Sequence, residues 1–337
     1  MAMLSGNMVK QAGKALKNYD SDDERFLRAL DVLDDWKFCH REIMDSAVQR
    51  LFDCAMSIDP DAIVVGRIKR TDSIIAKLCR PGESYNLNQL GDIAGCRAIV
   101  ESPDNVTALV ARLRGDGLFE VRKDHDYISS PKPSGYRSYH LIWQAPSGAG
   151  QSRRLSCEVQ VRTRLQHAWA TGFEVYGRIC DIDIKSGEGS SEEKEFFKLL
   201  ADCFASLEPG LDRNNSILPL NRLFQLNDRL HVAEKIEAAN NAVTLLGSDD
   251  LGTKEGYCLI TTDYGEQTID VCFYPSEDEC DAYTEYARFE RDKKEPRSID
   301  GVLVRASSSQ NLMKAYPLYS ACGDLFVEAW RRLESYR

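Results

Sequence analysis

Residues 157–162 constrain the fold most, because apolar and polar side chains alternate along them. A period of two places one set on each face of a β-strand: Cys157, Val159 and Val161 on one face, and Glu158, Gln160 and Arg162 on the other. The first face needs a hydrophobic core behind it. The second face presents an acid, an amide and a base in register, so we expect a sheet with one packed face and one polar face.

Other segments before residue 185 have the patterns of helices and strands around such a sheet. Residues 21–58 carry apolar positions at helical spacing and predict two helices or one broken helix. Residues 63–78 continue as a predicted helix, which Arg80, Pro81 and Gly82 end. Strand-like runs cover residues 93–100, 118–122, 139–144 and 155–162, with a helix at residues 105–114. This order predicts an α+β fold with a mixed β-sheet flanked by helices.

A polar linker at residues 185–191 separates a second predicted unit. It ends in a capping box, Ser190 with Glu193, that starts another helix. The later patterns predict a helix at 220–246, a hairpin of strands 257–262 and 268–274, a helix from 276, a strand at 302–306 and helices near the end. We therefore expect a helical segment at residues 1–60 packed on a domain at 61–187, followed by a smaller α+β domain at 190–337.

Composition excludes several classes of protein. With 337 residues and 43% hydrophobic content, two globular domains are expected, and no apolar run is long enough to span a membrane. The N-terminus lacks a secretory signal pattern, so we expect a cytoplasmic protein. The 11 cysteines are scattered without metal-ligand spacing and are expected to be reduced thiols. A net charge of -10 argues against a surface adapted everywhere to nucleic acid, but it permits a local basic cleft.

Two segments carry groups that suit the binding of a nucleoside triphosphate. Arg67, Arg70, Ser73 and Lys77 fall at spacings of three and four, which places them on one side of a predicted helix. A row of this kind suits phosphates, and a solvated basic face is the equal alternative. In GDIAGCRAIV, Asp92 lies at the start of a short strand and Arg97 projects from the same strand. The two suit Mg²⁺ and phosphate, respectively; an acid at a strand start and an arginine at the rim of a sheet are the ordinary alternative.

The segment KDHDYISSPKPSGYRSYH predicts a mobile basic loop. Its prolines and Gly135 prevent regular structure, and Gly135 releases Tyr136 to stack on a base. Lys132 supplies positive charge, and His140 can reach a phosphate or a sugar hydroxyl. An ordinary surface loop is the alternative for this segment alone. If Glu158 lies opposite Asp92 on a neighbouring strand, the two acids complete a magnesium site, and Glu158 is also placed to act as a base.

Residues 67–177 resemble the synthetase domain of the RelA/SpoT alarmone synthetases. The matching motifs are RxK with a downstream Ser and Lys (Arg67, Lys69, Ser73, Lys77), DIAGCR (Asp92, Arg97), DYI with PKPSGYRSYH (126–140), EVQVRT (158–163) and HAWA (167–170). The resemblance implies a nucleotidyltransferase-like fold that uses Mg²⁺ to transfer the β,γ-pyrophosphate of ATP to the 3′-hydroxyl of GDP or GTP, making (p)ppGpp.

The same resemblance assigns a role to each matched residue. It implies ATP binding by Arg67, Lys69, Ser73, Lys77 and Arg97. Asp92 and Glu158 would hold Mg²⁺ and serve catalysis. Lys132, Tyr136, His140 and Gln160 would bind the acceptor.

Departures from the family pattern leave other hypotheses open. Only about 66 residues precede Arg67, and the His125–Asp126 pair lies inside the synthetase motif, so we do not expect a hydrolase. Tyr139 stands where many alarmone producers carry an aliphatic residue. This keeps open a toxin-like pyrophosphokinase that acts on tRNA 3′ ends or adenine nucleotides and is controlled by a C-terminal domain that binds a protein trigger. A catalytically silent nucleotide- or partner-binding protein is a second alternative, and the association of copies into a homo-oligomer is also open.

Overall fold

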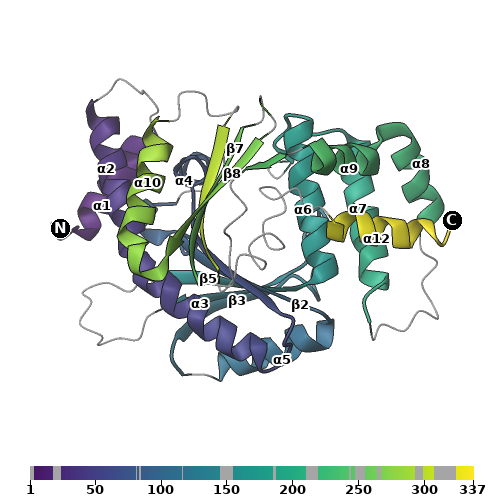
Figure 1. The fold of residues 1–337 in the computed structure, drawn as a ribbon, viewed down its shortest axis with the longest axis horizontal. Helices are drawn as coiled ribbons and strands as arrows, with labels where there is room; N and C mark the ends of the chain where they lie inside the picture. Colours follow the sequence, from purple (N-terminus) through teal and green to yellow (C-terminus); the bar gives the residue numbers. More distant parts are fainter. Residues whose placement is uncertain are drawn as a thin grey trace.

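One mixed β-sheet organises the chain in this computed structural model (Figure 1). The structure describes residues 4–17, 24–80, 82, 85–115, 117–144, 155–184, 187–209, 219–242, 244–246, 255–263, 266, 268–292, 299–306 and 324–337. Within these ranges nine strands form the sheet in the order β3-β4-β5-β2-β1-β9-β7-β8-β6. The predicted mixed sheet flanked by helices is therefore confirmed.

The strands of the first half match most of the sequence-based expectations. Their bounds are β1 Ile63–Ile68, β2 Ala94–Val100, β3 Glu120–Asp126, β4 Tyr139–Gln144 and β5 Ser156–Thr163. β2 and β5 are parallel neighbours, whereas β1–β2, β3–β4 and β4–β5 are antiparallel. The alternation expected in β5 is present as far as Gln160, since Cys157, Val159 and Val161 are fully buried and Glu158 and Gln160 are partly exposed. Arg162, expected on the polar face, is instead buried and contacts His167.

The helix expected at residues 63–78 is wrong in its first part. Residues 63–68 form strand β1, and helix α4 covers only Thr71–Leu78. A short apolar run fits a strand or a buried helix equally well by periodicity, and here pairing with two strands decides. β1 pairs with β2 on one side and with β9 (Ile299–Ala306) on the other. A Cβ at Gly66 would lie 2.3 Å from Val48 Cγ2, so this glycine lets α3 (Arg41–Met56) pack closely on the strand.

The C-terminal strands also depart from expectation, because they extend the same sheet instead of forming a separate one. β7 (Gly256–Asp263) and β8 (Thr268–Pro275) form the predicted hairpin, and β9 joins it to β1. Tyr257 and Leu303 belong to the same buried cluster as Val64 and Leu51. The physical cause is the open edge of β1, whose backbone groups β9 satisfies. The polar linker near residue 187 therefore separates two helices without dividing the sheet.

Helices gather in two groups at opposite ends of the molecule (Figure 1). One group contains α1 (Gly6–Leu16), α2 (Glu24–Cys39), α3 and α10 (Glu279–Asp292), and α5 (Pro103–Arg114) lies beside α3. The other group contains α6 (Arg164–Ile179), α7 (Ser191–Ser206), α8 (Leu220–Leu230), α9 (Val232–Ala242) and α12 (Asp324–Glu334). The second group has its own buried cluster, built around Phe196, Phe197 and Trp330.

Local signals set several helix ends in the second group. Ser190 and Glu193 form the predicted capping box of α7. The single helix expected at residues 220–246 is wrong, because His231 adopts a left-handed conformation with φ 53° between α8 and α9, and residues Thr244–Leu246 form strand β6. Asn227 stabilises this break, since its Oδ1 accepts a hydrogen bond from the Ala233 backbone at 3.0 Å. No helix in the described ranges is long and apolar enough to cross a membrane.

Candidate active site

A pocket of about 120 Å³ opens where β5, β2 and β1 lie side by side. Its lining comes from these strands and from residues next to them: Val65, Arg67, Lys69, Asp92, Gly95, Cys96, Arg97, Glu158 and Gln160. In the parallel register of β2 and β5, Gly95 lies opposite Glu158 and Arg97 opposite Gln160. A Cβ at Gly95 would meet only the Glu158 carbonyl oxygen, at 3.7 Å, and both residues line the pocket.

Asp92 lies between two lysines at one side of this pocket. Its Oδ2 is 2.5 Å from Lys69 Nζ and 2.7 Å from Lys77 Nζ. Burial raises the pKa of Asp92, but the charges of Lys69 and Lys77 outweigh burial and leave this pKa lowered. Burial also lowers the pKa of Lys69, against the opposing effect of Asp92. Asp92 is therefore ionised at neutral pH and holds both cations at the pocket.

Glu158 carries the second carboxylate of the pocket. His140 Nδ1 lies 3.2 Å from its Oε1, and Gln160 Nε2 donates to its Oε2 at 2.8 Å. Burial raises the pKa of Glu158, but the hydrogen bonds from His140 and Gln160 and the charge of Lys69 lower it to about 2. The carboxylate therefore stays charged throughout the neutral range and holds a proton weakly.

The two carboxylates fit a magnesium ion that arrives with a nucleotide. Asp92 Oδ1 is buried and has no hydrogen-bond partner, so it has an unused lone pair in a site that also contains Glu158. In the part of the chain that the structure describes, no group of three or more His, Cys, Asp or Glu side chains could hold a metal. Mg²⁺ commonly takes one or two carboxylates and completes its shell with water and substrate phosphates. The residues present fit that mode of binding.

The residues expected to bind ATP come together, although the predicted helical row is wrong. Arg67 projects from β1, Arg70 precedes α4, and Ser73 and Lys77 lie on α4, so the four share no helix face. Arg67, Lys69 and Arg97 nevertheless line the pocket, and Lys77 reaches it through Asp92. Ser73 is partly exposed on α4, apart from the pocket lining.

The residues expected to bind the acceptor form a chain that leads into the pocket. Tyr136 Oη lies 2.9 Å from His140 Nε2, and His140 contacts Glu158 as described above. Lys132 Nζ lies 5.1 Å from the Tyr136 ring centroid and 4.5 Å from that of Tyr127. Gln160 Oε1 accepts a hydrogen bond from Arg97 Nε at 3.3 Å, so this series of contacts extends to a residue expected to bind ATP.

Tyr136 is less exposed than its sequence context predicts. Its ring is partly buried against the cluster of the second helix group, with the Trp169 ring centroid at 6.3 Å. Gly135 has a φ of +93°, and its backbone lies against α7. The glycine therefore serves a close approach of two backbones, whereas the sequence suggested that it frees the tyrosine.

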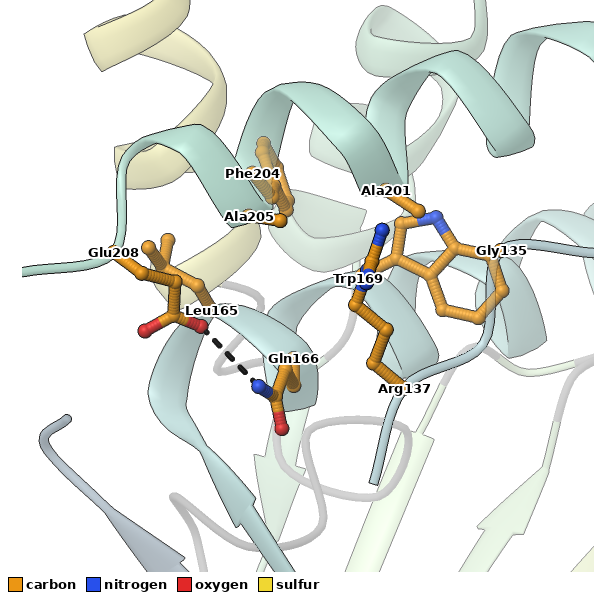
Figure 2. A pocket seen from close by; sticks show the side chains of 9 residues that line it. All are labelled: Gly135, Arg137, Leu165, Gln166, Trp169, Ala201, Phe204, Ala205 and Glu208. Atoms are coloured by element: carbon orange, nitrogen blue, oxygen red, sulfur yellow. Dashed lines mark hydrogen bonds between the residues drawn. The ribbon is translucent and has the colours of Figure 1, made fainter. Parts of the chain in front are cut away.

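A second, smaller cavity lies where α7 meets the start of α6 (Figure 2). Its volume is about 10 Å³, and its lining is Gly135, Arg137, Leu165, Gln166, Trp169, Ala201, Phe204, Ala205 and Glu208. Glu208 is buried, and its Oε1 accepts hydrogen bonds from Thr163 Oγ1 at 2.5 Å and from Gln166 Nε2 at 3.5 Å. Burial raises the pKa of Glu208 to about 7, despite the opposing hydrogen bonds from Thr163 and Gln166. Sequence patterns gave no sign of this buried acid.

Two acids of the second half reach the start of α4, which the sequence also did not indicate. Asp300 of β9 forms ion pairs with Arg70 and with Arg178, the latter at 2.7 Å. Glu290 of α10 accepts a hydrogen bond from the Thr71 backbone at 2.9 Å and pairs with Lys37. These contacts link segments far apart along the chain, so no local pattern could predict them.

Comparison with known proteins finds similarity over part of the chain. Residues 66–177 match the model for a region found in RelA/SpoT proteins. Two relatives from Bacillus subtilis (strain 168) are named GTP pyrophosphokinase YjbM and GTP pyrophosphokinase YwaC. The first is 31% identical over 126 residues, covering 37% of this chain and 60% of YjbM. The second is 29% identical over 154 residues, covering 42% of this chain and 73% of YwaC.

Among solved structures, the B. subtilis small alarmone synthetase 1 bound to its product pppGpp is 25% identical. The similarity covers 50% of this chain and 89% of that protein, with a TM-score of 0.44. The match to YjbM spans less than two thirds of that relative, and all of these similarities leave much of this chain uncovered.

Proposed function

We propose that the protein is a pyrophosphokinase that transfers the β,γ-pyrophosphate of ATP to the 3′-hydroxyl of GDP or GTP, since residues 66–177 match the model for a region found in RelA/SpoT proteins. The observation that carries this proposal is the pocket between β1, β2 and β5. It combines two carboxylates, Asp92 and Glu158, with three cationic side chains, Arg67, Lys69 and Arg97. Pyrophosphoryl transfer depends mainly on alignment and on neutralisation of phosphate charge, which this set of groups supplies.

The cationic residues would bind the polyphosphate of ATP. Arg67 and Arg97 enter the pocket from adjacent strands, and planar guanidinium groups bind phosphate oxygens through paired hydrogen bonds. Lys69 and Lys77 contact Asp92 in this structure. Phosphate oxygens would offer these lysines alternative acceptors and release the Asp92 carboxylate for a metal.

Magnesium would be held by Asp92 and Glu158 and would neutralise charge on the phosphates of ATP. In the reaction, the acceptor 3′-oxygen forms a bond to the β-phosphorus of ATP. The bond from that phosphorus to the α,β-bridging oxygen breaks, AMP leaves with the electron pair, and the proton of the 3′-hydroxyl passes to solvent water. Glu158 would accept the hydrogen bond of the 3′-hydroxyl and orient it, and its low pKa makes it better suited to this role and to metal binding than to strong base catalysis.

The acceptor nucleotide would lie at the Tyr136 and His140 side of the pocket. Lys132 and His140 would contact its phosphates, Gln160 would contact the sugar, and the partly buried Tyr136 would offer a ring edge to the base. The chain of contacts from Tyr136 through His140 to Glu158 supports this placement, since it connects the loop to the carboxylate that orients the 3′-hydroxyl.

An assay with γ-labelled ATP and Mg²⁺ tests the proposal. Label should move to GDP or GTP, and Glu158→Gln should reduce the rate at least about 100-fold, as loss of a positioned charge in a site does. Asp228→Asn is the matched control, because Asp228 pairs with Arg337 on the exposed surface. Parallel reactions with AMP, ADP and deacylated tRNA test other acceptors. Transfer to one of these alone would reject the guanine nucleotide acceptor, and no transfer to any acceptor would reject the proposed activity.

A further inference from the structure

Helix α7 lies outside the matched residues 66–177 and yet forms the floor beneath the loop between β3 and β4, here called the acceptor loop (residues 127–138). A Cβ at Gly135 would lie 2.7 Å from Ala201 Cβ, 3.3 Å from Lys198 Cα and 3.4 Å from the Phe197 carbonyl oxygen. Ala201 and Gly135 are both buried at this contact. The acceptor loop therefore rests directly on one face of α7, as Figure 2 shows for Gly135 and Ala201.

Arg137 fastens the acceptor loop to the same helix. Its Nη2 donates to Asp202 Oδ1 at 2.9 Å, and its Nη1 donates to the Ile128 carbonyl oxygen at 3.2 Å. One guanidinium thus connects α7 to the beginning and to the end of the loop. The two hydrogen bonds of Arg137 have a fixed relative direction, because the guanidinium group is planar.

The loop conformation held in this way sets the position of the next two groups toward the pocket. Tyr136 lies between Gly135 and Arg137, and its hydroxyl contacts His140, which contacts Glu158. α7 is itself fixed to α6, since Trp169 Nε1 donates to the Phe197 carbonyl oxygen at 2.7 Å. A shift of α7 would therefore displace the acceptor loop.

We propose that α7 is a positioning platform for the acceptor loop, in which Ala201 sets the closeness of the contact and Asp202 acts through Arg137 to orient Tyr136 and His140. The consequence for the reaction rests on the proposed function: Asp202 is a positioning residue for acceptor binding, and ATP binding does not depend on it. The platform itself is a statement about the loop and is testable without any activity.

Asp202 offers a clean test because its side chain is 49% exposed. Exposed ion pairs contribute little to stability, so Asp202→Ala leaves the fold intact. Asp202→Glu retains the charge and is the conservative variant. Glu195→Ala is the matched control, since Glu195 lies on the same helix and pairs with Arg222 away from the loop, with both side chains 42% exposed.

Hydrogen exchange of the full chain is measured first. In Asp202→Ala the amides of residues 127–138 should exchange at least about 3-fold faster than in wild type, whereas Glu195→Ala should match wild type. Steady-state kinetics follow, with the acceptor that the wild-type protein uses. Asp202→Ala should raise the acceptor KM about 5-fold with the ATP KM unchanged, and Asp202→Glu should restore most of the affinity.

If the amides of residues 127–138 exchange at the wild-type rate in Asp202→Ala, the proposal that α7 positions the acceptor loop is wrong. Faster exchange with an unchanged acceptor KM, or with an equal rise in both KM values, would overturn the positioning role. If the wild-type protein transfers pyrophosphate to no acceptor, the proposed function fails, and the exchange measurement alone decides whether α7 holds the loop.

Discussion

His140 Nδ1 lies 3.2 Å from Glu158 Oε1, and this contact joins the acceptor loop to the carboxylate pocket. The other nitrogen of the same ring meets the Tyr136 hydroxyl at 2.9 Å. His140 is almost fully buried, so both contacts form away from bulk water and fix the ring. A substrate hydroxyl that reaches Glu158 therefore meets a group whose orientation depends on the loop.

Removing the charge of Asp92 should abolish activity and leave the fold in place. Asn has the same shape as Asp but cannot neutralise Lys69 and Lys77 or hold a cation strongly. We expect Asp92→Asn to lower the rate of pyrophosphate transfer by about 100-fold or more. Rates are compared with those of Asp228→Asn, and circular dichroism checks the fold. A variant that keeps more than about a tenth of the wild-type rate would contradict the role of Asp92.

Glu208 should make stability fall as pH rises through neutrality. Its folded pKa is about 7, raised by burial from 4.5, with Glu101 raising it further and Arg137 opposing. Protonated Glu208 stabilises the fold at pH below about 4.5, and this contribution is lost as pH rises through 7. The shift corresponds to at most about 3 kcal/mol.

The isosteric variant Glu208→Gln isolates this effect, because its amide oxygen still accepts a hydrogen bond from Thr163. Chemical denaturation at pH 5.5 and pH 8 should show Glu208→Gln gaining about 1–3 kcal/mol relative to wild type at the higher pH. If the difference in free energy of unfolding between Glu208→Gln and wild type is the same at both pH values, Glu208 does not have a raised pKa in the folded protein.

Gly135→Ala should weaken acceptor binding because the added Cβ meets Ala201 at 2.7 Å. Gly187→Ala is the matched control, since Gly187 has a similar φ of +97° and a Cβ added there would meet nothing within 4 Å. Both variants bear the cost of a positive φ, and only the first one bears the steric clash. We expect the acceptor KM of Gly135→Ala to rise about tenfold.

A second substitution tests whether the clash is the cause. Ala201→Gly removes the opposing Cβ and should recover part of the acceptor affinity in the Gly135→Ala background. If Gly187→Ala is equally impaired, or if Ala201→Gly gives no recovery, close packing on α7 is not what the loop requires.

The sequence predicted the parts of this fold that local patterns determine. Alternation in β5 placed Glu158 and Gln160 together on the pocket face, and the capping box placed the start of α7 at Ser190. The prediction from sequence failed at β1, where a helix was expected and pairing with the distant β9 favoured a strand. The approach of Asp202 to Arg137 also had no local signal, because the orientation of α7 is set by tertiary packing.

Asp300 should contribute strongly to stability, because it pairs with Arg70 and Arg178 while itself buried. Burial raises the pKa of Asp300, but the charges of the two arginines outweigh burial and leave it lowered. Asp300→Ala leaves both cations without this partner and should reduce the free energy of unfolding by about 2–4 kcal/mol. The measurement is denaturant unfolding at pH 7. A loss below about 0.5 kcal/mol, typical of a surface substitution, would contradict this role.

The identity of the product formed from ATP tests the central claim most directly. The protein is incubated with ATP, GDP and Mg²⁺, and the nucleotides are separated and weighed by mass spectrometry. Transfer of pyrophosphate predicts that AMP appears in equal amount with a guanine nucleotide heavier than GDP by one pyrophosphoryl group, and that Glu158→Gln forms neither. Formation of ADP in place of AMP, or release of AMP without a modified acceptor, would contradict the account.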